Sequence, residues 1–437
     1  MAKQSKILIV DCGSPYTQLM ARKVRELGVY SEVLYSDSPE DKLKASEPTG
    51  IILSGKKDTI LGNVEAEVPA FLLNGAAPVL GIAYEGEGKA TAVQLCPKGE
   101  AVEMTDEALS SFIYDVCKCE KSWTLGSEWV DAEIARIRER VGSDRVICGL
   151  SGGVDSTVSA VITSKAVGDN LHCIFVDHGM MRKDEGKQVM ETYRMLNLNV
   201  IHVDASERFL TALAGVTEPE KKRKIIGELF IRVFEEEARK LGGADWLLQG
   251  TIYPDIIESG HGGADVIKSH HNVGGLPDDM KMQLLEPLRD LFKDEVRAVG
   301  KTLGIPANFL ERHPFPGPGL GVRCLGELKK ERLDILREAD AIFVDEIRKA
   351  GLYTKIWQAF AVLIPVRSVG VVNGTRQYGE TIVLRAVSSI DAMTAEWVHL
   401  PYELLDTVSA RICKEVPQVS RVAMDITGKP PATIEWE

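Results

Sequence analysis

Several features that define large classes of proteins are missing from this sequence. No apolar run approaches the ~20 residues of a membrane-spanning helix. The first residues lead directly into a strand pattern rather than a signal peptide, so we expect a cytoplasmic protein with no membrane partner. The eight cysteines have no regular spacing, which excludes a disulfide scaffold and indicates free thiols. The net charge of −12 argues against a general nucleic-acid surface, so local basic clusters must bind any phosphate ligand.

Two of the cysteines, Cys117 and Cys119, are separated by one residue, which invites interpretation as a metal site. No histidine lies near them, and the spacing is not that of a zinc knuckle. We therefore expect both thiols to pack on a helix.

A chain of 437 residues is too long for one hydrophobic core, so two or three domains are expected. Buried strand patterns alternate with helix-length segments, which is typical of α/β domains with parallel sheets. We place domains at residues 1–110, 111–310 and 311–437. The expected strands cover residues 6–11, 29–35, 50–54, 78–82, 145–147, 171–179, 200–204, 362–372, 380–387 and 419–425, and residues 249–259 are expected to form a further strand that runs into a polar turn. The expected helices cover residues 16–27, 112–119, 129–141, 158–166, 328–349, 394–397 and 403–415.

The central motif, at residues 151–157, reads Ser-Gly-Gly-Val-Asp-Ser-Thr and lies between a predicted strand and a predicted helix. Its glycines let the backbone approach a polyphosphate closely, and the loop amides and helix N-terminus supply hydrogen-bond donors. The lysine of a Walker A motif is absent, which argues against an ordinary P-loop nucleotidase. A glycine-rich turn with a helix cap is the simpler alternative. The motif resembles the pyrophosphatase loop of N-type ATP pyrophosphatases, which cleave ATP between its α and β phosphates.

This resemblance implies ATP and Mg²⁺ as cofactors. Asp155 would help to hold Mg²⁺, and the loop hydroxyls would donate to the leaving pyrophosphate. Adenine would lie near Val176, at the end of the next predicted strand. The expected ATP-binding residues are Ser151, Gly152, Gly153, Asp155, Ser156, Thr157, Val176 and Lys293.

The first 95 residues carry three segments that resemble the start of a class I glutamine amidotransferase domain. They read Asp-Cys-Gly-Ser-Pro-Tyr at 11–16, Gly-Ile-Ile-Leu-Ser-Gly at 50–55 and Val-Leu-Gly-Ile-Ala-Tyr at 79–84. In that family the third segment is a strand-to-helix elbow that carries the nucleophilic cysteine.

The chemistry of that family is missing here. Ala83 occupies the position of the nucleophile, and a methyl group cannot form a glutamyl thioester. The family also needs a later histidine, but the first histidine of this chain is His172. Cys96 is an alternative nucleophile without a nearby histidine base. We expect a shortened glutaminase-like domain without activity. An engineered Cys-to-Ala exchange would explain Ala83, but it would not explain the loss of the second half of the domain.

Four segments in order make the resemblance specific. They are the 151–157 loop, Gln-Gly-Thr-Ile-Tyr-Pro-Asp at 249–255, His-His-Asn-Val-Gly-Gly-Leu-Pro at 270–277 and Gly-Lys-Pro-Pro-Ala-Thr-Ile-Glu-Trp-Glu at 428–437. In this order they are similar to those of the GMP synthetases, which make GMP from XMP, ATP and an ammonia donor. The adjacent histidines lack a third nitrogen or sulfur ligand, and the Gly-Gly-Leu-Pro after them favours a mobile lid over a metal site.

The resemblance implies the architecture of the family. A doubly wound parallel-sheet ATP pyrophosphatase domain would follow the shortened α/β glutaminase-like domain. A small α+β dimerisation domain would end the chain, so a homodimer is implied. We expect residues 313–323 to be an extended connector, because alternating prolines and glycines exclude a helix.

The resemblance also implies roles for residues that match the family's motifs. One group of residues would lie at the reacting centre, and a second group would bind the nucleotide substrate. Arg223 belongs to the second group and comes from the basic run 221–224. The alternative interpretation of this run is a solvated helix face. The expected catalytic residues are Asp155, Asp255, Glu258 and Lys268. The expected substrate-binding residues are Arg223, Arg421, Lys429, Thr433 and Glu435.

The implied reaction is ATP-dependent adenylation of the C2 oxygen of XMP, followed by amination to GMP with release of AMP and pyrophosphate. Without a glutaminase, the nitrogen would come from free ammonia or from a separate glutaminase subunit. One alternative is an enzyme recruited to another nucleophile or to a related purine nucleotide. A second alternative is a non-catalytic nucleotide-binding regulator.

Overall fold

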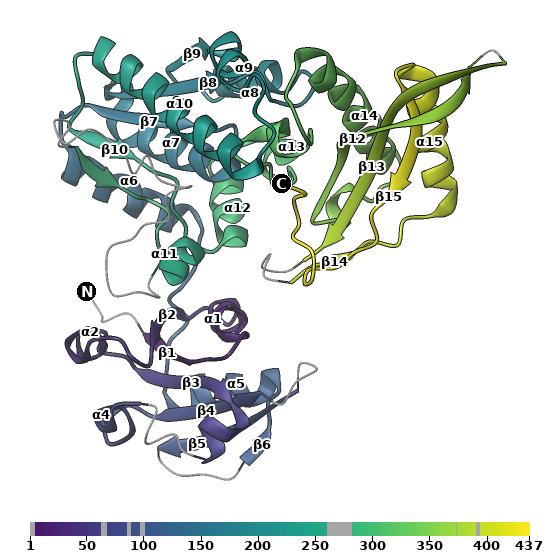
Figure 1. Ribbon diagram of the computed structural model, residues 1–437. Helices are drawn as coiled ribbons and strands as arrows, with labels where there is room; N and C mark the ends of the chain where they lie inside the picture. Colours follow the sequence, from purple (N-terminus) through teal and green to yellow (C-terminus); the bar gives the residue numbers. More distant parts are fainter. Residues whose placement is uncertain are drawn as a thin grey trace. The chain divides into compact units, whose positions relative to one another are not determined.

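The computed structural model describes residues 5–62, 68–84, 89–96, 101–259, 282–372, 374–389 and 394–437 (Figure 1). The chain divides into two compact units. The first comprises Met1–Val130, Thr251–Lys268 and Arg289–Glu295, and the second comprises Asp131–Gly250, Ser269–Leu288 and Val296–Glu437. The predicted bounds of three domains stay a prediction.

The first unit contains a six-stranded sheet in the order β2-β1-β3-β4-β5-β6. The first four strands are parallel, and β5 and β6 extend the sheet in antiparallel fashion. The strands are β1 (Lys6–Cys12), β2 (Tyr30–Tyr35), β3 (Gly50–Lys56), β4 (Val79–Tyr84), β5 (Ala90–Cys96) and β6 (Ala101–Glu103). The helices are α1 (Thr17–Glu26), α2 (Glu40–Ala45), α4 (Ala70–Leu73), α5 (Asp106–Ser111) and α11 (Tyr253–Ser259), with π-helical turns η1 (Asp58–Gly62) and η2 (Phe112–Val116).

The core of the first unit includes residues from two distant parts of the sequence. Tyr253, Ile257 and Phe292 are buried in the same cluster as Ile7 and Ile52 of the parallel strands. The segments around residues 255 and 292 therefore share a core with the N-terminal sheet.

The second unit contains a fully parallel five-stranded sheet in the order β11-β10-β7-β8-β9. Figure 1 shows α6 and α10 on opposite sides of this sheet. The strands are β7 (Val146–Leu150), β8 (Leu171–Asp177), β9 (Val200–Asp204), β10 (Trp246–Leu248) and β11 (Gln283–Leu285). The helices are α6 (Ser127–Val141), α7 (Val154–Val167), η3 (Gly168–Asn170), α8 (Glu185–Met195), α9 (Ser206–Ala212), α10 (Pro219–Lys240), α12 (Lys293–Thr302) and α13 (Ala307–Leu310); α6 and α12 begin in the first unit.

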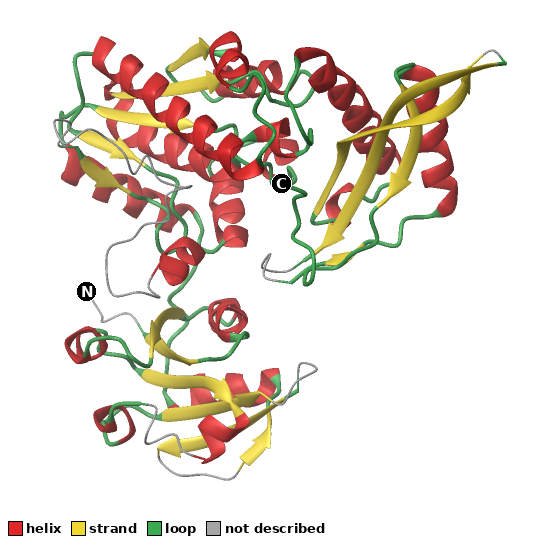
Figure 2. Cartoon of the chain, in the orientation of Figure 1, coloured by secondary structure: helices red, strands yellow, loops and turns green. Residues whose placement is uncertain are grey.

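The C-terminal part of the second unit is built on a mixed sheet in which the long strands β12 and β13 form a hairpin (Figure 2). β13 also pairs with β14 in antiparallel and with β15 in parallel fashion. The strands are β12 (Gln358–Val372), β13 (Thr375–Ser388), β14 (Glu396–Trp397) and β15 (Val419–Met424). The helices are α14 (Lys330–Lys349) and α15 (Tyr402–Glu415), with short 3-10 helices η4 (Gly319–Val322) and η5 (Tyr353–Lys355).

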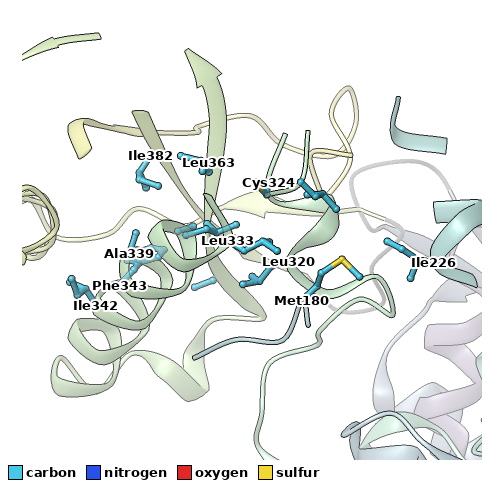
Figure 3. Close-up of a cluster of buried hydrophobic side chains, with 14 of the residues drawn as sticks. Met180, Ile226, Leu320, Cys324, Leu333, Ala339, Ile342, Phe343, Leu363 and Ile382 are labelled. Carbon is cyan, nitrogen blue, oxygen red and sulfur yellow. The ribbon is translucent and has the colours of Figure 1, made fainter. Parts of the chain in front are cut away.

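One hydrophobic cluster joins the two sheets of the second unit (Figure 3). Met180 and Ile226 come from the parallel-sheet part, and Leu333 and Phe343 come from α14. Leu363 of β12 belongs to the same cluster. The two sheets of the second unit therefore share a core.

The predicted fold class is confirmed for the N-terminal, central and C-terminal parts of the chain.

Four local predictions about helices need correction. Helix α7 begins at Val154, not at residue 158, so Asp155 and Thr157 are in its first turn. Within residues 249–259, expected to be a strand that runs into a polar turn, Tyr253–Ser259 form helix α11, because proline fits the first turn of a helix. Residues 394–397, expected to be helical, contain β14, which pairs with the end of β13. The connector includes the 3-10 helix η4, which the prolines before it do not prevent.

The N-terminal domain differs from prediction at two further places. The sequence analysis predicts neither β5 nor β6, and β5 pairs with β4 in antiparallel fashion. The helix expected over residues 112–119 ends early: Cys117 follows η2, and Lys118 has a φ of +56°, which ends the helix before Cys119. Both thiols are buried.

The seven cysteines that the structure describes with their side chains are free thiols, as expected. Among the described residues, none of the helices has both the length and the apolar composition needed to cross a membrane.

Candidate active site

The connection between β7 and α7 forms the candidate phosphate-binding loop. β7 ends at Leu150, and Gly152 has a φ of +76°, a left-handed conformation that side chains other than glycine rarely adopt. A Cβ on Gly152 would lie 3.4 Å from Val189 of α8. Ser151 and Gly153 are exposed, and the amides at the start of α7 add the positive end of a helix dipole. The loop therefore offers an anion site made largely of backbone.

The three hydroxyl groups of the loop have different surroundings. Ser151 Oγ and Ser156 Oγ lie 3.2 Å apart on the accessible side of the loop. Thr157 is fully buried, and its hydroxyl donates to the Gly153 carbonyl at 2.8 Å. The predicted donation from Thr157 to pyrophosphate is therefore not available in this conformation, because the hydroxyl stabilises the loop from behind. The predicted donation from Ser151 and Ser156 to pyrophosphate stays a prediction.

Asp155 is the second residue of α7 and is half-buried. Carboxylates are favourable in the first turn of a helix. Mg²⁺ in nucleotide sites is typically bound by one or two carboxylates together with phosphate oxygens. A single carboxylate beside a phosphate-binding backbone fits that donor set. Within the described parts of the chain, no group of three or more His, Cys, Asp or Glu side chains could hold a metal ion.

Gly250 is a site residue that sequence reasoning missed. A Cβ on it would lie 2.8 Å from the backbone nitrogen of Ser156 and 3.0 Å from the carbonyl carbon of Asp155. Real Cβ atoms do not approach a backbone so closely, so a side chain at position 250 would displace the first turn of α7. The Gln-Gly-Thr segment was noted for its resemblance alone, whereas its glycine is required because two backbone segments touch.

Val176 lies at the end of β8, as predicted, but its side chain is part of the hydrophobic core. Only its backbone can therefore contact an adenine ring.

Asp255 and Lys293 belong to the first unit. Asp255 lies in the first turn of α11, where its carboxylate accepts a hydrogen bond from the Ile252 amide at 3.0 Å. Lys293 is the first residue of α12. Glu258 lies on α11, and Lys268 with the predicted lid at 267–277 is outside the described residues.

Helix α11 is held against the N-terminal sheet by two tyrosines. The hydroxyl of Tyr253 accepts a hydrogen bond from the Val33 amide at 2.5 Å, and the hydroxyl of Tyr35 donates to the Ile257 carbonyl at 2.6 Å. The helix that carries Asp255 is thus fixed by β2.

The basic run of α10 contacts the chain's own C-terminal residues. Lys222 is fully buried, and its Nζ donates to a side-chain oxygen of Glu437 and to the Cys324 carbonyl at 3.0 Å. Arg223 donates to the Glu437 carbonyl. The interpretation of the basic run as a solvated helix face is wrong for Lys222, because this side chain is fully buried. A buried ammonium group needs hydrogen-bonding partners of this kind. The predicted substrate contact of Arg223 stays a prediction.

Glu435, predicted to bind the nucleotide substrate, is fully engaged within the protein. The buried Arg323 forms a bidentate pair with it, at 2.8 and 2.9 Å, and Gln358 Nε2 donates to the same carboxylate at 3.1 Å. The tail also docks through Lys429, whose backbone pairs with Ala395, and Thr433, whose carbonyl accepts from Arg385 at 2.8 Å.

Arg421 lies on β15, and its Nε donates to Ser368 Oγ at 3.1 Å. It does not belong to the tail that carries Lys429, Thr433 and Glu435. The structure therefore places the predicted substrate residues on three elements: α10, β15 and the tail.

Position 83, where the amidotransferase family is expected to carry its nucleophile, lies inside a sheet. Ala83 is fully buried in β4, where it pairs with Gly55 on one side and Thr91 on the other. β4 continues to Tyr84, and the next described strand runs back along it. An elbow that presents a nucleophile needs an exposed turn, and Ala83 is not at one.

Comparison with protein families finds three matches along the chain. The model of class-I glutamine amidotransferase matches residues 8–85, that of NAD synthase residues 129–229, and that of the GMP synthase C terminal domain residues 345–436.

Among curated proteins, a glutamine-hydrolyzing GMP synthase of Aeromonas hydrophila is 47% identical to this chain over 99% of each protein. The proteins of that name from Shewanella loihica and Vibrio cholerae are 47% and 48% identical, over 99% of this chain. The Aeromonas alignment has 524 positions and this chain has 437 residues, so at least 87 positions have no residue from this chain. Among solved structures, an NMN synthetase from Francisella tularensis shows only a low likeness, with a TM-score of 0.35 at 18% identity over 47% of this chain and 83% of that one.

Proposed function

Because this chain belongs to the GMP synthase family, we propose that it converts XMP to GMP with ATP as the activating substrate. The observation that carries the proposal is the 151–157 loop, in which the left-handed Gly152 and the start of α7 form a backbone site for phosphate.

Amination at C2 of a purine needs activation, because hydroxide or oxide is a poor leaving group. In the proposed reaction the C2 oxygen of XMP attacks the α phosphorus of ATP, and pyrophosphate leaves. The nitrogen nucleophile then attacks C2, and the oxygen departs as part of AMP. Positioning and electrostatic stabilisation supply most of the catalysis in phosphoryl and nucleotidyl transfer.

The loop residues would bind the leaving pyrophosphate. Backbone amides and the hydroxyls of Ser151 and Ser156 are the donors that face outward. Asp155 would hold Mg²⁺, which when bound neutralises charge on the phosphates. Asp255, Glu258, Lys268 and Lys293 are proposed to position XMP and ATP and to stabilise the developing charge. Closure of the segment at 267–277 over the site would keep water away from the adenylyl intermediate.

We propose that the nitrogen is free ammonia or is delivered by a separate glutaminase subunit. Ala83 has no nucleophilic atom, and the sequence contains no histidine before His172. The amidotransferase match covers only residues 8–85, and at least 87 positions of the Aeromonas alignment lack a counterpart in this chain. These observations support the loss of glutamine hydrolysis. They also favour the second candidate, an enzyme that activates XMP or a related purine nucleotide for another nucleophile.

The substrate side is proposed to include Arg223, Arg421, Lys429, Thr433 and Glu435. Since Glu435 pairs with Arg323 here, substrate binding would require the tail to exchange that partner. A homodimer is proposed as well, supported by exposed apolar side chains on the β12–β13 hairpin, among them Val371 and Tyr378.

The test measures pyrophosphate and GMP formed from Mg-ATP and XMP with ammonium, with glutamine or without a nitrogen source. We expect GMP with ammonium and none with glutamine. Asp155→Asn should abolish pyrophosphate release, whereas Asp169→Asn, an exposed aspartate after α7, should not change it. Absence of XMP-dependent pyrophosphate would refute the proposal. Pyrophosphate without GMP would identify the second candidate, and glutamine-driven GMP would show that glutaminase activity is retained.

A further inference from the structure

Arg312, which follows α13, contacts the phosphate-binding loop directly. Its Nη1 donates to the carbonyl of Gly152 at 3.2 Å, and its Nη2 pairs with a carboxylate oxygen of Glu185, the first residue of α8. The side chain of Glu185 is 5% exposed and that of Arg312 is 21% exposed. The guanidinium also lies over the ring of Phe309, 5.2 Å from its centroid. The fork of the arginine thus joins the loop to a buried carboxylate.

The contact decides which way one peptide group of the loop faces. In a planar trans peptide, the carbonyl of one residue and the amide of the next point in opposite directions. Arg312 holds the Gly152 carbonyl, so the Gly153 amide must face the other side of the loop, where Ser151 Oγ accepts from it at 3.3 Å. That side carries the exposed Ser151 and Gly153.

Without this contact the peptide would be free to rotate. Glycine flanks it on both sides, and glycine tolerates the backbone angles of either orientation. The rotated state would point a carbonyl oxygen, instead of an amide, at the phosphates. Its partial negative charge would repel pyrophosphate, so the orientation fixed by Arg312 is the one that can bind the anion.

The carboxylate behind Arg312 is itself held in place. One oxygen of Glu185 pairs with Arg312, and the other accepts a hydrogen bond from the Arg182 amide at 3.1 Å. The next residue along the chain, His313, is buried, and its ring stacks on Tyr353 with centroids 3.9 Å apart. Arg312 is therefore fixed through both its side chain and its backbone.

From these contacts we propose that Arg312 is a positioning residue for pyrophosphate binding and release, acting through the Gly152–Gly153 peptide. The inference rests on the proposed function only in that ATP is taken as the ligand of the loop. Lysine cannot replace the arginine, since a single ammonium cannot reproduce the planar fork that spans a carbonyl and a carboxylate.

The test compares Arg312→Met and Arg312→Lys with the wild-type protein by calorimetric titration with Mg-pyrophosphate and by steady-state kinetics. We expect both variants to bind pyrophosphate roughly 10- to 100-fold more weakly, the range typical of residues that orient a direct ligand. The KM for ATP should rise, and the KM for XMP should not change. Guanidinium ion should partly restore binding to Arg312→Ala.

Arg297→Met is the matched control. Arg297 is half-buried and donates to the Leu310 carbonyl at 3.1 Å, close in sequence to Arg312. Its variant should bind pyrophosphate like the wild type. If Arg312→Met does not fold because Glu185 is left unpaired, the double variant with Glu185→Gln removes the buried charge. The affinity of this double variant for pyrophosphate is then measured in place of that of the single variant.

The outcomes separate the two proposals. Wild-type affinity in folded Arg312 variants would overturn the role of Arg312 and leave the proposed function untouched. Equal weakening by Arg297→Met would also overturn it, because the effect would then be general. A wild-type protein that binds neither Mg-ATP nor pyrophosphate would refute the proposed function instead.

Discussion

His313 should make the stability of the second unit depend on pH. Its ring is buried, and its Nδ1 accepts a hydrogen bond from the Ala359 amide at 3.2 Å while its Nε2 donates to the Tyr353 carbonyl at 2.8 Å. This arrangement requires the neutral ring, because a protonated Nδ1 could not accept. Burial, the largest cause, and the positive charges of Arg182 and Arg348 together lower the pKa of His313 from 6.5 to about 4.

The sign of the effect follows from the protons bound in each state. Between the native pKa of about 4 and the unfolded value of 6.5, the unfolded chain binds a proton at this site and the native protein does not. The contribution of His313 is therefore fully present above pH 6.5 and is lost as the pH falls toward 4. The native and unfolded pKa values of His313 differ by about 2.5, and each pKa unit corresponds to 1.36 kcal/mol, so the histidine contributes about 3 kcal/mol to the free energy of unfolding. Roughly 2 kcal/mol of this contribution should be lost by pH 5.

The assay is urea unfolding of the wild-type protein and of His313→Gln at pH 7.5, 6.5, 5.5 and 5. Glutamine can accept from one backbone group and donate to the other, but it does not titrate. Other groups that titrate in this range are the same in both proteins, so the difference in unfolding free energy isolates the histidine. We expect the variant to be the less stable protein at pH 7.5 and the gap to narrow by roughly 2 kcal/mol at pH 5. A gap that stays constant with pH would refute the reasoning.

Three further changes test other parts of the structure. Arg25→Met removes one partner of the buried ion pair with Glu295, at 2.7 Å, and should lower the free energy of unfolding by about 3 kcal/mol in urea titrations. The double variant with Glu295→Gln should recover part of that loss. If the effects of the two substitutions simply added, the pairing would be contradicted. Gly152→Ala should bind pyrophosphate more weakly than the wild type and cost about 1–2 kcal/mol of stability, because of the positive φ; unchanged affinity would mean that the loop shape is not required. Ala83→Cys should release no glutamate from glutamine, and measurable release would show that a glutaminase site persists.

Much of the fold could be predicted because the parallel strands have simple signals. The strands β1, β7 and β8 each contain an uninterrupted run of apolar or small residues, which is typical of strands covered on both faces. The loop at 151–157 was recognisable because its glycines and hydroxyls are close in sequence. The GMP synthase family could be predicted for the same reason, since its motifs are short and contiguous.

The remaining features depend on contacts between distant residues. β5 forms by pairing with the open edge of β4, and no local sequence pattern predicts that pairing. Gly250 matters because the start of α7 lies 2.8 Å from where its Cβ would be. Lys222 looked like part of a solvated basic face, yet it is buried against Glu437, more than 200 residues along the chain. Arg312 carried no signal in sequence, because its role depends on a carbonyl 160 residues away.

The N-terminal domain has a structural role that does not depend on glutaminase activity. Arg25 of α1 is surrounded by the rings of Tyr30, Trp123, Tyr253 and Phe292, with its guanidinium carbon 4.7–5.1 Å from each centroid. Two of these rings come from the segments that flank Asp255 and Lys293 in the sequence. Removing the domain would expose the rings of Tyr253 and Phe292 and leave α11 without β2, to which Tyr253 is hydrogen-bonded. The domain can therefore lose its nucleophile at little cost to the synthetase half, whereas it cannot be deleted without taking apart a core that supports residues proposed to bind XMP and ATP.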